Sequence, residues 1–227
     1  LMVDGEVTAQ EGGIALDTSA VLAEGYAGQT FLVAQGGLTF ASLPEGFVVN
    51  EVSMTGALSQ YILAKDAPFP WKATLTGDTS WFGATWTDAN GAPVDPALWT
   101  VAYAPSVSVE LTVDSETTLS DLSGAVGAVT VKGAAPLTLS GGPFNTSSLT
   151  IDAGAELRTD TAQFRVLALN EETPASATVN GTWVMNASSG YTLPAISGAG
   201  TIVKTGTGTL SLGRGTVVAP TVRVEEG

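Results

Sequence analysis

Aliphatic and polar residues alternate in short triplets along the second half of the chain. In each triplet two aliphatic residues flank one polar residue, so both aliphatic side chains point to the same face of an extended strand. Gly, Asp, Asn or Pro separates the triplets, mostly at intervals of roughly 8–12 residues, which is typical of many short strands with tight turns. The pattern predicts strands at Val107-Ser-Val109, Leu111-Thr-Val113, Val129-Thr-Val131, Leu137-Thr-Leu139, Leu149-Thr-Ile151, Leu210-Ser-Leu212 and Val222-Arg-Val224.

Two all-β architectures fit this spacing: an antiparallel β-sandwich, or a right-handed parallel β-helix (solenoid) with rungs of about 20 residues. The segments 149–154 and 222–227 share one form, in which an alternating strand is followed by an acidic residue and a glycine. A recurring unit favours the solenoid, because each copy can bury its apolar face only against a neighbour. We therefore predict the parallel β-helix, with the sandwich as the alternative.

The first half of the chain is also β-rich but less regular. Short apolar runs such as Phe31-Leu-Val33 and Tyr61-Ile-Leu63 are separated by glycine turns. Two prolines in Asp66-Ala-Pro-Phe-Pro70 mark a boundary, and four of the five tryptophans lie between residues 71 and 99 directly after it. We predict a β-rich N-terminal segment over residues 1–65, a Trp-rich connecting segment over 66–105 and β-helix repeats over 106–227.

Composition excludes several functions. The formal net charge of −14 is opposite in sign to that of a nucleic-acid binder, so no nucleic-acid partner is expected. The chain has no histidine and no cysteine, which removes Ser-His-Asp and Cys-His catalysis as well as imidazole and thiolate metal sites. No cofactor is predicted.

One stretch carries a family resemblance. Gly200-Thr-Ile-Val-Lys-Thr-Gly-Thr-Gly-Thr-Leu-Ser-Leu212 resembles the autotransporter-associated β-strand repeat, most clearly over residues 198–227. This repeat occurs in passenger regions of bacterial surface proteins. The resemblance implies a structural or adhesive fragment that is secreted or held at the outer membrane surface of a Gram-negative bacterium. It also implies the remainder of a longer polypeptide as a partner, an array truncated near Gly227, and host glycans or glycoproteins as ligands.

The tryptophans are candidate ligand-binding residues. An exposed indole can stack on the apolar face of a sugar ring, which would make a glycan-binding module. The alternative is that the same side chains pack the end of the solenoid, because tryptophan is largely buried in most proteins. The residues concerned are Trp71, Trp81, Trp86 and Trp99.

Two carboxylates suggest a hydrolase as the alternative function. Asp17-Thr-Ser19 and Asp78-Thr-Ser80 resemble the Asp-Thr-Gly loops of aspartic proteases, in which two carboxylates share a proton and activate water. Serine replaces the loop glycine in both copies, and the second copy lacks the preceding apolar run, so two strand ends capped by Asp-Thr turns are the favoured interpretation. The alternative is a secreted hydrolase of glycoproteins or glycans acting through Asp17 and Asp78, whereas the favoured role is non-enzymatic.

Oxygen ligands for a metal are also present. Asp88, Asn90 and Asp95 lie at the close spacing found in calcium loops, although Asp-Ala-Asn-Gly is also common turn chemistry. Three segments fit the N-glycosylation sequon, and in a bacterial protein we interpret them as polar loop residues: Asn145-Thr-Ser147, Asn180-Gly-Thr182 and Asn186-Ala-Ser188.

Overall fold

The structure is a computed structural model in which every described element is a β-strand. It describes residues 14–15, 30–35, 40–42, 47–53, 58–65, 69–94, 104–169, 174–212 and 220–226. The chain forms two compact units, one of Leu1–Ala67 with Asp95–Val101 and one of Pro68–Val94 with Ala102–Gly227. The described segments contain no helix able to cross a membrane.

The first unit contains two small sheets. β1 (Ile14–Ala15) pairs in parallel with β3 (Phe40–Ser42). β2 (Thr30–Gln35), β4 (Phe47–Ser53) and β5 (Leu58–Lys65) form an antiparallel sheet in the order β2-β5-β4. Tyr61 on the central strand is 1% exposed, so at least one of the predicted apolar runs packs as a core strand.

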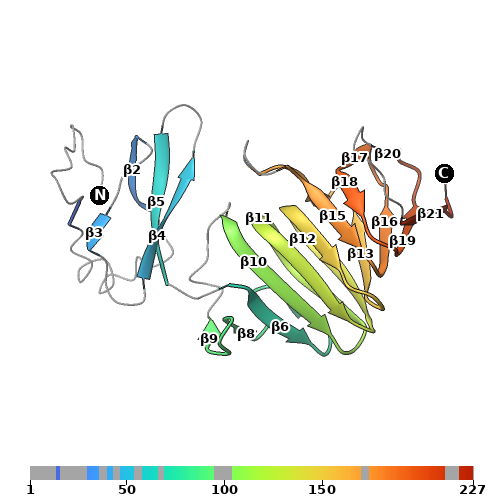
Figure 1. The fold of residues 1–227 in the computed structure, drawn as a ribbon, viewed down its shortest axis with the longest axis horizontal. Helices are drawn as coiled ribbons and strands as arrows, with labels where there is room; N and C mark the ends of the chain where they lie inside the picture. Colours follow the sequence, from blue (N-terminus) through green and yellow to red (C-terminus); the bar gives the residue numbers. More distant parts are fainter. Residues whose placement is uncertain are drawn as a thin grey trace. The chain divides into compact units, whose positions relative to one another are not determined.

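The second unit is a parallel β-solenoid of about five turns over residues 108–224. Figure 1 shows its long strands lying side by side. The parallel pairing confirms the β-helix prediction and excludes the antiparallel sandwich. Its strands are β10 (Ala104–Val113), β11 (Thr117–Gly133), β12 (Pro136–Ile151), β13 (Glu156–Asp160), β14 (Phe164–Val166), β15 (Ser176–Val179), β16 (Thr182–Asn186), β17 (Tyr191–Leu193), β18 (Ala195–Ser197), β19 (Thr201–Thr205), β20 (Leu210–Leu212) and β21 (Thr221–Val224).

The strands form stacked faces. We call the stack of β10, β15 and β18 with residues 128–133 and 148–151 the first face. The second face consists of residues 117–119 and 136–138 followed by β13, β16, β19 and β21. A third stack joins residues 124–126, 144–146 and β14. β11 and β12 are long because each continues through the bends between these faces.

The turns repeat at the predicted length where the stack is regular. Val109, Val129 and Leu149 are direct partners, so one turn advances the chain by 20 residues. The next partner of Leu149 is Ala177, because a longer connection interrupts the third turn. Regular stacking then resumes at about the same interval from β16 to β19 and β21.

Alternation fills the interior with apolar side chains. In the triplets from β10 to β12 the aliphatic residues point inward and are almost fully buried, while the polar residue points outward. Five aromatic rings form a column through this interior, with adjacent centroids 4.6, 5.5, 6.1 and 6.5 Å apart. In order, the rings belong to Trp86, Trp81, Phe144, Phe164 and Trp183.

The N-terminal end of the first face carries one more parallel strand followed by two antiparallel strands. β6 (Trp71–Leu75) adds in parallel to β10, and β8 (Trp86–Thr87) and β9 (Pro93–Val94) then pair antiparallel beside it. β7 (Thr79–Ser80) pairs with β11 on the second face. Residues 68–94 therefore belong to the same compact unit as the solenoid.

Candidate functional site

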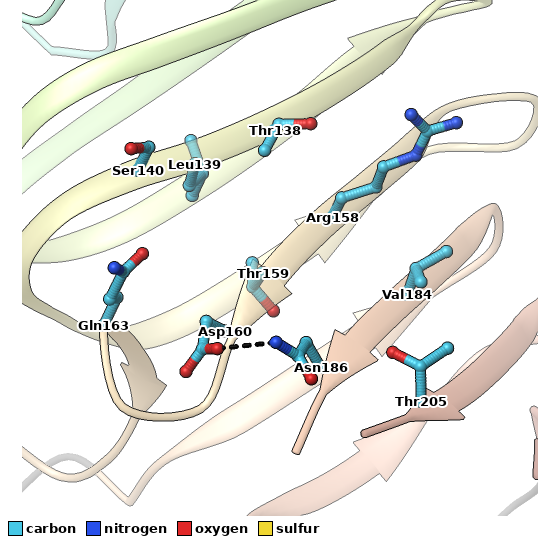
Figure 2. A pocket seen from close by; sticks show the side chains of 10 residues that line it. All are labelled: Thr138, Leu139, Ser140, Arg158, Thr159, Asp160, Gln163, Val184, Asn186 and Thr205. Carbon is cyan, nitrogen blue, oxygen red and sulfur yellow. Dashed lines mark hydrogen bonds between the residues drawn. The ribbon is translucent and has the colours of Figure 1, made fainter. Parts of the chain in front are cut away.

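A groove of about 380 Å³ lies on the outer side of the second face. It crosses strands β12, β13, β16 and β19, and Figure 2 shows the side chains around it. The lining residues are Thr138, Leu139, Ser140, Arg158, Thr159, Asp160, Gln163, Val184, Asn186 and Thr205.

The alternation of the strands places these groups. On β13 and β16 the even-numbered side chains point outward, because Leu157, Trp183 and Met185 are fully buried inside. Parallel pairing then sets Asp160 opposite Asn186, and Asn186 opposite Thr205. Residues more than 40 positions apart in the sequence therefore meet along one line across the sheet.

Asp160 is held firmly at one end of the groove. Its Oδ2 accepts a hydrogen bond of 2.8 Å from Asn186 Nδ2, the contact drawn in Figure 2. Its Oδ1 accepts from the Ala162 backbone N–H at 2.8 Å and from the Ser188 hydroxyl. Three donors on two successive turns fix this carboxylate, so it is a preorganised acceptor in the groove.

Arg158 lies at the other end and has two carboxylate partners. Its Nε donates to Glu156 at 2.6 Å and its Nη1 donates to Glu116 at 2.7 Å. The hydrogen bond to Glu156, more than any other interaction, raises the pKa of Arg158, and burial opposes it. These glutamates balance the charge of Arg158. Apart from Asp160, the rest of the groove offers hydroxyl and amide groups with two aliphatic side chains, Leu139 and Val184.

This chemistry suits an uncharged ligand that carries several hydroxyl groups. Hydroxyl and amide side chains can both donate and accept hydrogen bonds, as a sugar can. Asp160 offers an acceptor, and Val184 offers an apolar contact for C–H groups.

The predicted tryptophan site lies in a different place from the groove. Trp71, Trp81 and Trp86 are 3%, 5% and 1% exposed, and Trp99 lies outside the described residues. Trp81 and Trp86 are brought together, with ring centroids 4.6 Å apart and Trp86 Nε1 donating to Trp81 O at 2.9 Å. Packing of the solenoid end accounts for the described members of this cluster, because their indole faces are covered.

Of the predicted carboxylate pair, Asp78 is described and Asp17 lies outside the described residues. Asp78 is exposed, and its Oδ1 accepts from the Thr118 backbone N–H at 2.6 Å. This contact ties the turn after β6 to the start of β11. A dyad of Asp17 and Asp78 stays a prediction.

Of the predicted metal ligands, Asp88 and Asn90 are described and Asp95 is not. Asp88 is buried, and its Oδ1 accepts from the backbone N–H groups of Asn90 and Ala92 at 2.8 and 2.9 Å. This is a side-chain-capped turn. Within the described ranges, no group of three or more His, Cys, Asp or Glu residues could hold a metal ion.

Asp160 is absent from the residues that the sequence singles out, whereas its partners Asn186 and Ser188 are noted there only as a sequon. The pairing of Asp160 with Asn186 depends on a turn of 26 residues, which the regular interval of 20 does not predict. The sequence signal closest to this site was the polar segment Asn186-Ala-Ser188, because the side chains of Asn186 and Ser188 both donate hydrogen bonds to Asp160.

Comparison of the chain with protein-family models, curated proteins and solved structures found no match.

Proposed function

We propose that this chain is a structural and adhesive part of a secreted or cell-surface bacterial protein, similar in role to an autotransporter passenger. The observation that carries the proposal is the solenoid itself, in which stacked turns bury aliphatic columns and direct Ser and Thr side chains outward. Each turn adds outward-facing hydroxyl groups at a fixed spacing, which suits a scaffold that displays contact groups.

The charged groups support a scaffold rather than a catalyst. Lys132 pairs with Glu110 at 2.8 Å on the first face, whereas Arg158 pairs with glutamates on the second face. Lys204 is buried and donates to the backbone carbonyls of Gly206 and Glu226. These basic groups each have a separate local role, and the described residues do not gather them around one reaction centre.

The groove on the second face supplies the adhesive contact in this proposal. Its ligand is a neutral glycan, free or on a glycoprotein, held by hydrogen bonds to Asp160, Asn186 and the surrounding hydroxyl groups. The high negative charge of the chain agrees with an uncharged or weakly basic ligand.

The test compares glycan binding by the wild-type protein with glycan binding by a variant in which a large side chain fills the groove. Wild-type protein is applied to immobilised neutral oligosaccharides and to a mucin-type glycoprotein, alongside Ser140→Trp, which fills the groove. Thr178→Trp is the matched control, because Thr178 is a similarly half-buried outward residue on the first face.

The proposal expects saturable binding to at least one glycan, at least a tenfold loss in Ser140→Trp and unchanged binding in Thr178→Trp. Absence of binding by wild type, or equal binding by both variants, would contradict adhesion through this groove.

A further inference from the structure

Two aliphatic side chains interrupt the polar outer side of the second face. Val184 on β16 and Val203 on β19 are direct partners that point outward. The other outward side chains of β13, β16 and β19 are all polar or charged: Glu156, Arg158, Asp160, Thr182, Asn186, Thr201 and Thr205. Val203 is 3% exposed, whereas Val184 is half-buried and lines the groove. The apolar strip therefore reaches the groove through Val184.

Strand propensity does not account for a valine at this position. Threonine has nearly the same shape, is also β-branched and is also favoured in strands. Threonine occupies the groove at Thr138, on the same row of the sheet, and at Thr205. At Val184 a methyl group thus stands where other turns carry a hydroxyl group.

The groove has a polar side and an apolar side. Asp160, Asn186 and Thr205 are successive partners on three strands and form the polar side. Val184 lies two residues before Asn186, roughly 6.5 Å along the strand, and Figure 2 shows both side chains at the groove. Leu139, the other aliphatic residue of the lining, points inward and is 4% exposed. A bound sugar ring would therefore meet hydrogen-bonding groups at one side and Val184 at the other.

An acidic sugar fits this arrangement poorly. Among the residues that line the groove Arg158 alone is basic, and its guanidinium group already pairs with Glu156 and Glu116. Asp160 adds a negative charge that would repel an acidic ligand.

A hydroxymethyl group against Val184 is also unfavourable. Its hydroxyl group would lose contact with water and gain no hydrogen bond from the valine, which costs free energy. A methyl group of the ligand at the same place carries no such cost and buries apolar surface on Val184.

We propose that the groove selects a 6-deoxyhexose residue of a glycan, a sugar in which a methyl group replaces the hydroxymethyl group of a hexose. The methyl group packs on Val184, and the ring hydroxyl groups bond to Asp160, Asn186 and Thr205. This assignment rests on the proposed glycan-binding function and adds the class of sugar that the groove prefers. Val184 is accordingly a specificity-determining residue.

The experiment compares sugars that differ in a single hydroxyl group. Methyl α-L-fucoside is paired with methyl α-L-galactoside, and methyl α-L-rhamnoside is paired with methyl α-L-mannoside. In each pair the first sugar carries the methyl group and the second the hydroxymethyl group. Dissociation constants for the 227-residue protein come from NMR titration, and saturation transfer identifies the ligand protons closest to the protein.

Two variants locate the preference. Val184→Thr keeps the shape of the side chain and adds a hydroxyl group in the groove. Thr182→Val is the matched control, because it makes the reverse change at a half-buried outward position of the same strand that does not line the groove. Circular dichroism confirms that both variants keep the fold.

The expected result is an at least fivefold tighter binding of the 6-deoxy sugar in at least one pair, by wild type and by Thr182→Val. An apolar pocket discriminates against an added hydroxyl group by up to about 100-fold, and a half-exposed contact gives less. The preference should fall to within about twofold in Val184→Thr, and the methyl protons should show the strongest saturation transfer in wild type.

The outcomes distinguish this inference from the function on which it rests. Equal dissociation constants within each pair, together with loss of binding in Ser140→Trp, would overturn the preference and leave glycan binding in the groove. A preference that persists in Val184→Thr would overturn the role of Val184. Absence of saturable binding of all four sugars would also overturn the preference, while the immobilised oligosaccharides decide the proposed function separately.

Discussion

Two buried polar side chains inside the solenoid, Trp183 and Tyr191, have specific partners. Trp183 Nε1 donates to Thr159 Oγ1 at 2.9 Å, although both residues are buried. The Tyr191 hydroxyl accepts from the Val166 N–H at 2.9 Å and donates to the Val166 carbonyl at 2.8 Å. Such pairs remove the cost of burying polar groups and fix neighbouring turns in register.

Tyr191→Phe is expected to destabilise the protein by about 1–3 kcal/mol at neutral pH, because it leaves the N–H and C=O of Val166 unpaired. Burial raises the pKa of Tyr191, so the neutral phenol is favoured in the folded state. Its contribution is complete below the unfolded pKa of about 10 and is lost as pH rises toward the folded pKa.

Urea unfolding of wild type and Tyr191→Phe over pH 7–11 measures this dependence. The difference in unfolding free energy should be constant to about pH 9 and then shrink, because only the wild type must ionise this phenol on unfolding. A difference that stays constant to pH 11 would show that Tyr191 titrates normally.

At the scale of single elements, neighbouring turns approach closely where glycine occurs. A Cβ on Gly200 would overlap the carbonyl oxygen of Gly181 and lie 2.7 Å from the carbonyl carbon of Asn180. Both obstacles are backbone of the preceding turn, which cannot rotate away. The glycine before β19 is thus required by the contact between turns.

Gly200→Ala should therefore cost at least about 2 kcal/mol of stability, because the two turns must separate. Gly190→Ala is the matched control, because a Cβ there meets no atom within 4 Å, and its cost should stay within about 0.5 kcal/mol. Equal chemical-denaturation midpoints for the two variants would show that the turns can shift freely.

The strands were the most predictable part of the fold. Val129-Thr-Val131 and Leu149-Thr-Ile151 alternate in the sequence and lie as direct partners in the structure. Their alternation fixes which side chains are buried, but not which strands pair. The matching segments at 149–154 and 222–227 illustrate this limit, because the first lies on the first face and the second on the second face.

At the scale of the whole molecule, charge is the dominant long-range effect. The chain carries 14 more acidic than basic residues. The described ion pairs, such as Arg223–Glu225, lie largely at the surface, where each contributes about 0–1 kcal/mol. Repulsion among the excess carboxylates therefore outweighs the loss of these pairs when salt is added.

Sodium chloride should accordingly raise the melting temperature. Relief of about 1 kcal/mol of repulsion corresponds to about 2–4 °C for a chain of this size. The rise should level off near 0.2 M, because the screening length falls to about 8 Å at 0.15 M. Calorimetry from 0.01 to 1 M salt tests this, and a fall in melting temperature would mean that ion pairs dominate.

The candidate groove could not have been predicted, because it depends on the path of the whole chain. Asp160, Asn186 and Thr205 come from three successive turns of unequal length. The sequence shows that each is polar and lies at a strand end, but their meeting requires the register. Three of the predicted tryptophans, Trp71, Trp81 and Trp86, show the reverse case, since residue type suggested a surface site and the fold places these three inside.

The 20-residue step between Val109, Val129 and Leu149 bears on how such a chain can change during evolution. Duplicating or deleting one complete turn would return every later side chain to its original face, so the gene could alter the length of the stack without redesigning its interior. A one-residue insertion within a strand would instead exchange inner and outer side chains from that point to the next bend. Selection should therefore tolerate length variation in whole turns and confine irregular insertions to connections such as the one between β14 and β15.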